Sequence, residues 1–570
     1  MKVLIAQTNT TPRDFIGNCN QIKMAINHAK DAKALLVVTP ELSIPGYGVK
    51  DLMYQNNFVE RNLTALKDIC TYQFENYPDS YVVVGYVDYN NSGVGKPFRN
   101  MVAILCNGNI IATYAKQILP FYDVFDEARY YEPGKELTVV EIEGVKWGIC
   151  ICEDLFNDKG QDDYNYRNNP LSRYRDIGID HIISVNGSPF TIGKPQKRDE
   201  IFKKSFQKGT LIYVNQIGGQ DDLVFDGCSL IIEDGLVIHR SDLALESTYE
   251  TINIPRDIST QPSVSNWNEY PKKHLFQMLV LSLRDYCRKN NFKTIVFGSS
   301  GGIDSALVAC LSCEAIGPEN VYGIRMPSIY SSAGSRLDAE QLHENLGCHD
   351  LEVPISHMEI VGNYKKSFLS QNPELSEQKY NEVADENIQA RIRGTLVMYY
   401  SNSWGALPLT TGNKSEISVG YSTLYGDQAG GFAPISDLWK TQVYELAKYY
   451  NGLSLKNKIP QSIIGKAPSA ELKPDQKDED SLLPYPVLDV ILKDYVENHI
   501  GTFDDFLRMS IDHSLPLLEW LKNIEYAQKT YEHTIHLVDR SEYKRRQSAP
   551  GTKVSKVAFG TGRRMPITKK

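Results

Sequence analysis

Three residues in the first half of the chain have the types needed to hydrolyse an amide through a thiol. Glu41 follows the apolar run ALLVVT, Lys116 closes a predicted hairpin, and Cys152 ends the run KWGICIC. Such hydrolysis needs a thiolate, a proton relay and a stabiliser for the oxyanion. Half-ionising an ordinary cysteine at neutral pH takes about 2 kcal/mol, which one ammonium about 4 Å away supplies. We therefore expect Lys116 to hold the Cys152 thiolate while Glu41 relays the proton.

A second cysteine, Cys150, lies two residues before Cys152. Because side chains alternate along a strand, we expect both thiols on the same face. Cys152 is nearer the end of the strand and directly precedes Glu153 and Asp154, so we assign it as the nucleophile. Cys150 is predicted to be a buried apolar thiol.

The second half contains a glycine-rich loop between a predicted strand and a predicted helix. It reads Gly298, Ser299, Ser300, Gly301, Gly302, Ile303, Asp304 and Ser305. Glycines let the backbone approach a ligand closely, while small hydroxyls and the first helical N–H groups face an anion. No Lys-Ser or Lys-Thr pair follows the glycines, so this is not a Walker A loop.

The elements that must position the first set of residues are short strands alternating with helices. Strands are predicted at residues 2–7, 34–39, 81–87, 146–152, 181–186 and 211–216, and hairpins at residues 101–116 and 229–239. An amphipathic stretch covers Gly17–Ala32. Parallel runs combined with hairpins predict sheets with helices packed outside them.

A change in composition separates the two halves. Residues 253–271 are rich in Pro, Ser and Asn and predict a linker between a domain over residues 1–252 and a domain over residues 272–570. A helix is predicted at about residues 272–289. Strands at Thr294–Phe297 and Val321–Arg325, with an apolar helix between them, form a βαβ pattern.

Composition limits the classes of protein that the chain can belong to. Its 570 residues carry 61 Lys and Arg against 70 Asp and Glu, a net charge of −9, which argues against a protein that binds nucleic acid over its whole surface. Ten cysteines in this length form no disulfide framework. No apolar run approaches the roughly 18 residues that span a bilayer. We expect a cytoplasmic enzyme that binds neither nucleic acid nor membranes.

The whole SGGIDS string resembles the pyrophosphate-binding loop of the ATP pyrophosphatases, which adenylate a substrate and release pyrophosphate. Further strings follow it in order: ENIQARIR from Glu386, TGNKSE from Thr411, YSTLYGD from Tyr421, FAPI from Phe432, Lys440, and PSAEL from Pro468. Their order and spacing resemble the NAD synthetase family. Leu424 stands where the ammonia-only members have a lysine, which places the chain in the glutamine-dependent branch.

This resemblance implies a role for each matching residue. ATP would be contacted by Gly298, Ser299, Ser300, Gly301, Gly302, Ile303, Asp304, Ser305, Thr411, Lys440 and Ser469. The substrate deamido-NAD⁺ would be contacted by Asn387, Arg391, Glu416, Tyr421, Ser422, Thr423, Leu424 and Lys544. Mg²⁺, which prefers carboxylate and phosphate oxygens, would be held by Asp304 and Glu416. We also expect the basic run Lys544-Arg545-Arg546 to face phosphate rather than to form a solvated tail.

Glu41, Lys116 and Cys152, with the residues around them, resemble the triad of the nitrilase superfamily. This implies a glutaminase in which Tyr122, Ser188 and Lys194 place the glutamine and Glu127 supports the triad and the glutamine site. The two resemblances together imply an α/β protein with an N-terminal αββα nitrilase-like sandwich. Its C-terminal domain would be a parallel-sheet, Rossmann-like α/β domain of the ATP-pyrophosphatase type.

The fusion of the two halves predicts one reaction, because a glutaminase releases the ammonia that an adenylating synthetase consumes. The expected substrates are ATP, deamido-NAD⁺ and L-glutamine, with Mg²⁺, and the product is NAD⁺. Ammonia is mostly protonated at neutral pH, so we expect a shielded passage for it. The family also implies a homo-oligomer built on synthetase-domain dimers.

Two alternatives remain at this point. The chain could be an ATP-pyrophosphatase amidotransferase that acts on another acid or on a tRNA base, against which the strings around Asn387 and Tyr421 argue. It could also be a nucleotide-responsive binding or scaffold protein with degenerate sites. The presence of all three triad residues and of Asp304 argues against this second alternative.

Overall fold

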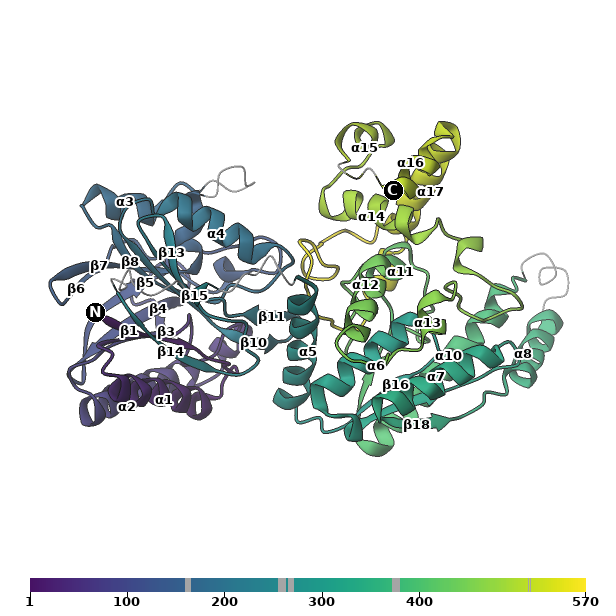
Figure 1. Cartoon of the computed structure of the whole chain (residues 1–570), viewed down its shortest axis with the longest axis horizontal. Coiled ribbons are helices and arrows are strands. Elements are labelled where there is room, and N and C mark those ends of the chain that lie inside the picture. Colours follow the sequence, from purple (N-terminus) through teal and green to yellow (C-terminus); the bar gives the residue numbers. More distant parts are fainter. Residues whose placement is uncertain are drawn as a thin grey trace. The chain divides into compact units, whose positions relative to one another are not determined.

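The computed structural model describes residues 1–158, 166–254, 263–264, 271–371, 380–510, 512 and 514–569. Its internal contacts divide the chain into two compact units, Met1–His274 and Leu275–Lys570 (Figure 1). Most of the predicted linker 253–271 lies outside the described residues. Among the described helices, none is long and apolar enough to cross a membrane.

The first unit contains two large sheets and one small hairpin. In order across the first sheet, the strands are β14 (Thr248–Asn253), β1 (Lys2–Gln7), β2 (Leu36–Val38), β3 (Tyr81–Tyr89), β4 (Phe98–Cys106) and β5 (Asn109–Ala115). The second sheet runs β15 (Ser263–Val264), β13 (Leu236–Arg240), β12 (Leu230–Glu233), β9 (Thr210–Asn215), β8 (His181–Asn186), β7 (Val145–Ile151) and β6 (Val139–Ile142). The hairpin pairs β10 (Ile217–Gln220) with β11 (Leu223–Asp226).

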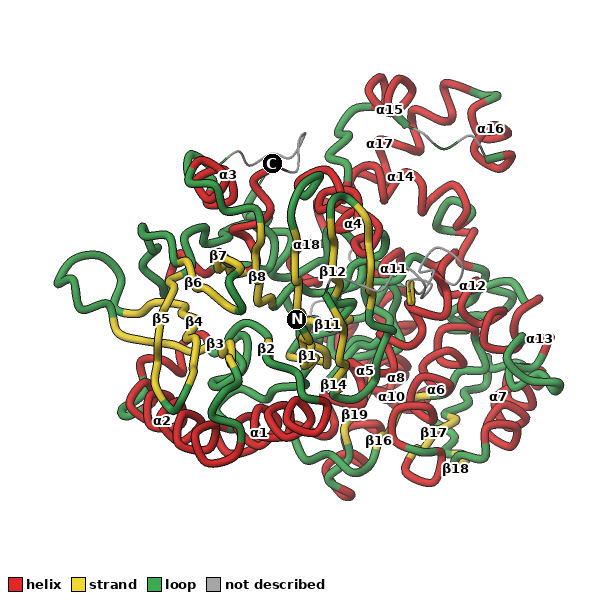
Figure 2. Tube along the Cα trace, turned by 60° about the vertical axis from the view of Figure 1, so that its left-hand side comes forward, coloured by secondary structure: helices red, strands yellow, loops and turns green. Residues whose placement is uncertain are grey.

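Helices cover the outer face of each large sheet. They are α1 (Phe15–Ala32) and α2 (Phe58–Asn76) on the first sheet, and α3 (Pro170–Asp176) and α4 (Lys194–Ser205) on the second. Figure 1 shows the strands between these two pairs, and Figure 2 shows α1 and α2 along the first sheet. The αββα layering predicted from the sequence is confirmed.

The apolar runs of the strands are explained by burial on both faces. Along β1, Val3 and Ile5 pack into the core between the sheets with Ile149 of β7, whereas Leu4 and Ala6 face α1 and α2. A strand covered on both sides carries apolar residues at every position rather than at alternate ones.

The centre of each sheet is parallel. Strands β1, β2 and β3 run parallel in one sheet, and β7, β8 and β9 run parallel in the other. The carboxyl ends of parallel strands meet at one edge of a sheet. The loops that carry Glu41, Cys152 and Ser188 leave β2, β7 and β8 at such ends.

The second unit is built on a four-stranded parallel sheet. Its strands in order are β18 (His349–Glu352), β17 (Val321–Arg325), β16 (Ile295–Gly298) and β19 (Leu407–Leu409). Helices before and around the sheet are α5 (Pro271–Lys289), α6 (Ile303–Ile316), α7 (Ala333–Leu346), α8 (His357–Gln371), α10 (Val383–Trp404), α11 (Lys414–Val419), α12 (Lys440–Asn451) and α13 (Gln461–Gly465). The parallel α/β class predicted for this half is confirmed.

The strand order places a ligand-binding crevice at the end of β16. The chain proceeds outward from β16 to β17 and β18, then returns to add β19 on the other side of β16. In such sheets, ligands bind at this reversal, beyond the carboxyl ends of the strands. The loop from Gly298 to Ser305 leaves β16 at this point and leads into α6.

The remaining helices form a separate cluster with its own apolar core. They are α14 (Tyr485–Glu497), α15 (Phe503–Met509), α16 (Leu515–Leu521), α17 (Ile524–Arg540) and α18 (Glu542–Arg545). In the described part of the chain, short 3₁₀ segments are found at Lys50–Tyr54, Glu127–Arg129, Cys152–Asp158, Pro318–Asn320 and Asp478–Asp480. Helix α18 brings Lys544 back toward α11, where the Lys544 ammonium donates hydrogen bonds to the carbonyls of Gly420 and Ser422.

Candidate active sites

Two of the three predicted amide-hydrolysing residues form an ion pair in the interior of the first unit. The Lys116 Nζ lies 2.7 Å from Glu41 Oε1 and 2.8 Å from a carboxylate oxygen of Glu127. The side chains of Glu41 and Lys116 are fully buried. One ammonium is therefore shared by two carboxylates in a site shielded from water.

The Glu41 carboxylate is fixed by two further donors. Asn100 Nδ2 donates to Oε1 over 2.7 Å, and the backbone N–H of Gly187 donates to Oε2 over 2.9 Å. The loop that carries Glu41 crosses β3 at Gly85, where a Cβ atom would lie 2.3 Å from the Leu42 nitrogen. A glycine at this position is required for the loop to lie this close to the sheet.

Cys152 is held in an unusual backbone conformation at the end of β7. Its φ of 45° lies in the left-handed region that non-glycine residues rarely adopt. The alternation of the strand is broken there, so the thiol packs with Ile149 and Ile151 in the core between the sheets. Cys150 packs instead beneath α3 and α4. The prediction that the two thiols share a face is therefore wrong, because β7 ends at Ile151 and not at Cys152.

The electrostatics of this site keep the free thiol protonated. Burial raises the pKa of Cys152 well above its usual value, Glu41 raises it further, and Lys116 only partly opposes them. Burial alone would lower the pKa of Lys116, but Glu127 and Glu41 raise it well above normal. From the sequence alone, we expect a resting thiolate at Cys152. The structure differs because the charge of Lys116 is already neutralised by the two glutamates.

Asp154 joins the two strand ends that carry Lys116 and Cys152. Its Oδ1 accepts from the backbone N–H groups of Gln117 (3.1 Å) and Ile118 (2.8 Å), and its Oδ2 accepts from Ile151 N–H over 3.0 Å. Burial raises the pKa of Asp154 to about 6, against the effect of these donors. The carboxylate thus fixes the spacing between the ammonium and the thiol.

The residues predicted to place glutamine lie near the thiol, and one acidic partner was missed. The Tyr122 hydroxyl donates to Glu153, at 3.0 Å and 3.1 Å from its two oxygens. Lys194 begins α4 and interacts electrostatically with Cys152 and Glu153. Glu153 directly follows the nucleophile in the sequence, and that position was the signal that could have identified it.

Ser188 is held by a buried network that the sequence did not reveal. Its backbone N–H donates to Asn215 Oδ1 over 2.9 Å, and its carbonyl accepts from Arg198 over 3.0 Å. Arg198 is itself paired with Asp226 at 3.0 Å, and both side chains are buried. Arg198 lies on the buried face of α4 with Pro195, Ile201 and Phe202, so its helical spacing from these apolar residues was the signal that could have identified it.

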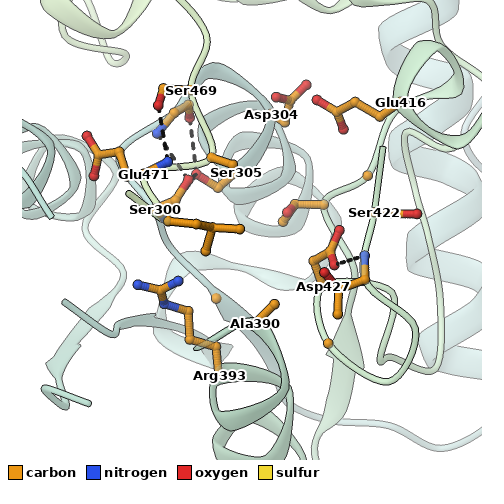
Figure 3. Close-up of a pocket in the computed structure, with 18 of the residues that line it drawn as sticks. Ser300, Asp304, Ser305, Ala390, Arg393, Glu416, Ser422, Asp427, Ser469 and Glu471 are labelled. Atoms are coloured by element: carbon orange, nitrogen blue, oxygen red, sulfur yellow. Dashed lines mark hydrogen bonds between the residues drawn. The ribbon is translucent and has the colours of Figure 1, made fainter. Parts of the chain in front are cut away.

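The second unit encloses a cavity of about 470 Å³ at the end of β16 (Figure 3). Most residues predicted to contact ATP or the dinucleotide line it: Gly298, Ser299, Ser300, Gly302, Ile303, Asp304, Ser305, Asn387, Thr411, Glu416, Tyr421, Ser422, Thr423, Lys440, Ser469 and Lys544. Three predicted residues are not part of its wall: Gly301, Arg391 and Leu424.

Each of the three exceptions has a structural reason. Gly301 has a φ of 75°, and a Cβ atom there would lie 2.1 Å from the Ser335 carbonyl, so this glycine serves the turn of the loop. Arg391 and Leu424 are joined to each other by a 3.3 Å hydrogen bond from Arg391 Nε to the Leu424 carbonyl.

Of the two arginines at positions 391 and 393 of α10, Arg393 faces the cavity and Arg391 does not. Positions 383, 386, 387, 390, 393, 394 and 397 of α10 all line the cavity, with the spacing of one helical face. Helical spacing from Asn387 reaches Arg391, whereas spacing from Glu386 and Ala390 reaches Arg393, so the sequence alone does not choose between the two arginines. Burial lowers the pKa of Arg393.

The cavity wall carries as many cationic side chains as carboxylates. The cations are Arg325, Arg336, Arg393, Lys440, Lys466 and Lys544, and the carboxylates are Asp304, Glu386, Glu416, Asp427, Glu471 and Asp478. In Figure 3, Asp304 and Glu416 lie at one end and Arg393 at the other. A ligand in this cavity therefore meets side chains of both charges.

Two carboxylates converge on one lysine at the acidic end. The Lys440 ammonium is paired with Asp304 and lies 3.1 Å from Glu416 Oε1. Burial raises the pKa of Glu416 to about 7, with Lys440 opposing and Asp304 adding to the rise. The same carboxylates overcome the effect of burial on Lys440 and raise its pKa.

Asn413 explains why the TGNKSE string orients these carboxylates. Its side chain accepts from the Glu416 backbone N–H over 3.0 Å, while Glu416 Oε2 accepts from the Asn413 N–H over 3.3 Å, forming a capping box at the start of α11. The Asn413 amide also donates to Asp304 Oδ1 over 2.9 Å. One capping residue therefore positions both predicted metal ligands.

Only Lys544 of the basic run reaches the cavity. Arg545 is buried and donates to the carbonyls of Ile417 and Ser418. Arg546 is paired with Glu542. Of the three residues expected to face phosphate, Lys544 alone is placed where it could contact a ligand in the cavity.

The comparisons with known proteins agree over the whole length of the chain. Residues 2–248 match the carbon-nitrogen hydrolase family model, and residues 275–548 match the NAD synthase family model. The chain is 36% identical to a glutamine-dependent NAD⁺ synthetase of Thermotoga maritima, and the match covers 100% of this chain and 98% of that protein. It is 39% identical to a protein of the same name from Synechocystis, and that match covers 99% of this chain and 98% of the other protein.

Two solved structures have the same fold. The glutamine-dependent NAD⁺ synthetase of Acinetobacter baumannii, determined in complex with ADP, superposes with a TM-score of 0.72 at 33% identity, over 99% of this chain and 98% of the other. A glutamine-dependent NAD⁺ synthetase from Cytophaga hutchinsonii gives a TM-score of 0.79 at 21% identity, over 100% and 98%. At that lower identity, the second likeness supports the fold alone.

Proposed function

This chain belongs to the glutamine-dependent NAD⁺ synthetase family, and from that premise we propose how its residues divide the reaction. The enzyme is a ligase that forms a carbon–nitrogen bond with glutamine as the nitrogen donor. It adenylates deamido-NAD⁺ with ATP and amidates the product with ammonia from glutamine. The products are NAD⁺, AMP, diphosphate and glutamate. The observation that carries the proposed division is the buried Glu41–Lys116 pair in one unit and the cavity at the SGGIDS loop in the other.

In the first unit, Glu41 is the general base for a neutral thiol. It takes the proton of Cys152 as the sulfur attacks the glutamine amide, and returns it to the departing ammonia. Lys116 remains cationic and stabilises the negative charge that develops during the attack. Glu41 then takes a proton from the water that hydrolyses the glutamyl thioester and returns it to the Cys152 sulfur as glutamate leaves, which restores the neutral thiol. Glu127 holds the second side of Lys116, and its pKa is raised to about 7 by burial and Glu41, against the effect of Lys116.

Opposite charges near the thiol match the two charged groups of the amino acid. Lys194 would bind the α-carboxylate together with Ser188, and Glu153, to which Tyr122 donates, would bind the α-ammonium. Burial and the neighbouring Arg198 lower the pKa of Lys194 to about 8, while Cys152 and Asp226 oppose the shift. Recognition of glutamine should therefore depend on pH in the range where this lysine titrates.

The KM for glutamine is expected to rise as the pH increases through about 8. Lys194 is cationic below its pKa and neutral above it, so its attraction for the carboxylate is lost on the alkaline side. One pH unit above the pKa, the KM should be about tenfold higher. The measurement is glutamate release against pH. Lys194→Arg should flatten this rise because arginine stays charged.

Two further variants separate this role from a general effect of charge. Lys194→Gln should raise the KM by about 30-fold or more at every pH below 8, with a much smaller change in kcat. Lys204→Gln, an exposed lysine on the same helix, is the matched control and should behave as the unmodified enzyme. A KM in the unmodified enzyme that does not change between about pH 7 and pH 9 would contradict the assignment.

In the second unit, the backbone N–H groups of the Gly298–Ser305 loop and the start of α6 would bind the pyrophosphate portion of ATP. Thr411, Lys440 and Ser469 would complete the ATP site. The dinucleotide would contact Asn387, Tyr421, Ser422, Thr423 and Lys544. We retain Arg391 and Leu424 as dinucleotide contacts outside the cavity wall, and Gly301 as part of the loop.

Asp304 and Glu416 fit a Mg²⁺ ion that is shared with phosphate oxygens. In the described part of the chain, no group of three or more His, Cys, Asp or Glu residues is placed to hold a metal alone. The two carboxylates are already turned toward one cation, the Lys440 ammonium, so their oxygens are oriented for positive charge. When bound, the ion would neutralise charge on the departing pyrophosphate. Lys440 would then be free to contact the phosphates.

Domain limits, location and assembly are proposed on the same basis. We place the glutaminase domain at residues 1–252, a linker at 253–271 and the synthetase domain at 272–570. All ten cysteines are free, which agrees with the reducing cytoplasm. A homo-oligomer built on synthetase dimers would cover Tyr399 and Trp404 of α10, which leave apolar surface exposed.

The test is incubation of the protein with ATP, MgCl₂, deamido-NAD⁺ and glutamine, followed by chromatography. AMP and NAD⁺ should appear together and in equal amounts. Omission of deamido-NAD⁺ should suppress the formation of AMP. NAD⁺ that does not appear, or AMP that forms with another acid instead, would contradict the proposal.

A further inference from the structure

A chain of hydrogen bonds lies directly behind the nucleotide loop and has no part in the reaction as described so far. His343 of α7 is completely buried. Its Nε2 lies 3.0 Å from Ser299 Oγ, and its Nδ1 lies 2.6 Å from Asp350 Oδ1. Arg325 Nε donates to the same Asp350 oxygen over 2.8 Å. Ser299 and Arg325 both line the cavity.

The sheet is shaped to accept this imidazole. A Cβ atom on Gly323 of β17 would lie 2.3 Å from His343 Nε2, so only a glycine leaves room for the ring. The Phe297 ring of β16 meets the imidazole edge to face, with centroids 6.2 Å apart. The backbone N–H of Ser299 is paired with the Ile324 carbonyl over 2.8 Å. The histidine is thus fixed against the same two strands from which the loop departs.

The hydrogen bonds determine which atom carries each proton. A carboxylate only accepts, so His343 Nδ1 is the protonated nitrogen and donates to Asp350. The neutral ring then offers a lone pair at Nε2, and the Ser299 hydroxyl donates to it. If His343 takes up a second proton, Nε2 becomes a donor and the direction of the Ser299 bond reverses.

We propose that His343, oriented by Asp350, is a positioning residue for the nucleotide loop, and that it takes up a proton when the pyrophosphate portion of ATP occupies the cavity. This inference rests on the proposed placement of ATP phosphates at Gly298–Ser305. An anion beside the loop favours a cationic imidazole behind it, and proton uptake in turn strengthens binding of the anion. In the reversed bond the Ser299 oxygen accepts from Nε2, so the hydroxyl hydrogen of Ser299 is free to donate to another acceptor.

The groups around His343 act on its protonation in opposite directions. It faces Asp350 on β18, Arg325 on β17 and the neutral Ser299 and Phe297 beside β16. Burial lowers the pKa of His343, Asp350 raises it and Arg325 lowers it again. The free enzyme therefore holds a neutral ring at neutral pH, and an added anion shifts the balance toward the protonated form.

The experiment measures binding of inorganic pyrophosphate with Mg²⁺ by calorimetry in two buffers of different ionisation enthalpy. Proton uptake on binding should be larger in the unmodified enzyme than in His343→Gln, which keeps a hydrogen-bonding amide but cannot titrate. The affinity ratio between about pH 6 and about pH 8 should fall by about threefold or more in that variant. Subtracting the proton uptake of His343→Gln from that of the unmodified enzyme removes the protons that pyrophosphate itself and Glu416 take up or release.

Three other variants complete the test. His349→Gln, at the neighbouring β18 position and bonded to the Glu319 carbonyl, is the matched control and should leave uptake unchanged. His343→Ala should raise the KM for ATP about tenfold in the ammonium-supported reaction, with little change in kcat, and His343→Gln should partly restore it. Asp350→Asn should also reduce the proton uptake on pyrophosphate binding. This variant provides a second test if His343→Gln does not fold.

Equal proton uptake in the unmodified enzyme, His343→Gln and Asp350→Asn would overturn the inference. So would an unchanged KM for ATP in His343→Ala. Because binding of pyrophosphate is measured without turnover, this failure is distinct from a failure to make NAD⁺, which would instead contradict the proposed function.

Discussion

Replacing Cys152 by alanine is expected to abolish NAD⁺ synthesis from glutamine while leaving synthesis from added ammonium largely intact. Without the sulfur, no glutamyl thioester forms, and the rate with glutamine should fall by about 10⁴-fold or more. Every described residue that lines the synthetase cavity belongs to the second unit, so external ammonia should still be captured. The two rates are compared by NAD⁺ formation at saturating ATP and deamido-NAD⁺.

The matched control for this variant is Cys150→Ala. Cys150 is a buried thiol two residues away, but it packs beneath α3 and α4 rather than between the sheets. Its replacement should cost about 1 kcal/mol of stability through lost packing and should preserve glutamine use. Denatured Cys150→Ala protein quenched during turnover should carry a glutamyl adduct, and Cys152→Ala should not. Loss of both activities in a folded Cys152→Ala protein would contradict the division of labour.

The second large effect is expected from Asp304→Asn. This substitution removes one of the two carboxylates that face Lys440 and are proposed to hold Mg²⁺. Adenylation should slow by about 10³-fold with either glutamine or ammonium as the nitrogen source, because the charge on pyrophosphate is no longer neutralised. The measurements are AMP and pyrophosphate release, together with the Mg²⁺ concentration that gives half-maximal activity.

Two further variants keep this result specific. Asp504, like Asp304, lies in the first turn of a helix, but this helix is α15 and the side chain is exposed. Asp504→Asn is therefore the matched control and should change neither the rate with glutamine nor the rate with ammonium. Glu416→Gln should raise the Mg²⁺ requirement in the same direction as Asp304→Asn. Full adenylation activity in Asp304→Asn at a low Mg²⁺ concentration would exclude the assignment of this carboxylate.

Features that depend on the local sequence were predicted well. The strands Lys2–Gln7, His181–Asn186 and Val321–Arg325 begin and end as the apolar runs do. The SGGIDS loop lies between β16 and α6 as its glycines require. The TGNKSE string begins a helix with a capping box, and this motif is recognisable in sequence because its partners are three residues apart.

Features that depend on contacts distant in the sequence were not predictable. The ionisation of Cys152 is set by how Glu41 and Glu127 share the charge of Lys116, and no spacing in the sequence reports that. The left-handed φ of Cys152 ends the strand one residue early and changes the face of the thiol. On α10, both Arg391 and Arg393 are compatible with a helix that passes the cavity, and only the packing selects Arg393.

The enclosed, uncharged state of the Cys152 sulfur also decides how the enzyme tolerates chemical stress. Peroxides and alkylating reagents attack thiolates far faster than thiols. A nucleophile that loses its proton only when an amide is in place spends most of its lifetime in the form least open to such damage. We therefore expect peroxide and alkylating reagents to inactivate the free enzyme more slowly than an enzyme whose nucleophile rests as a thiolate.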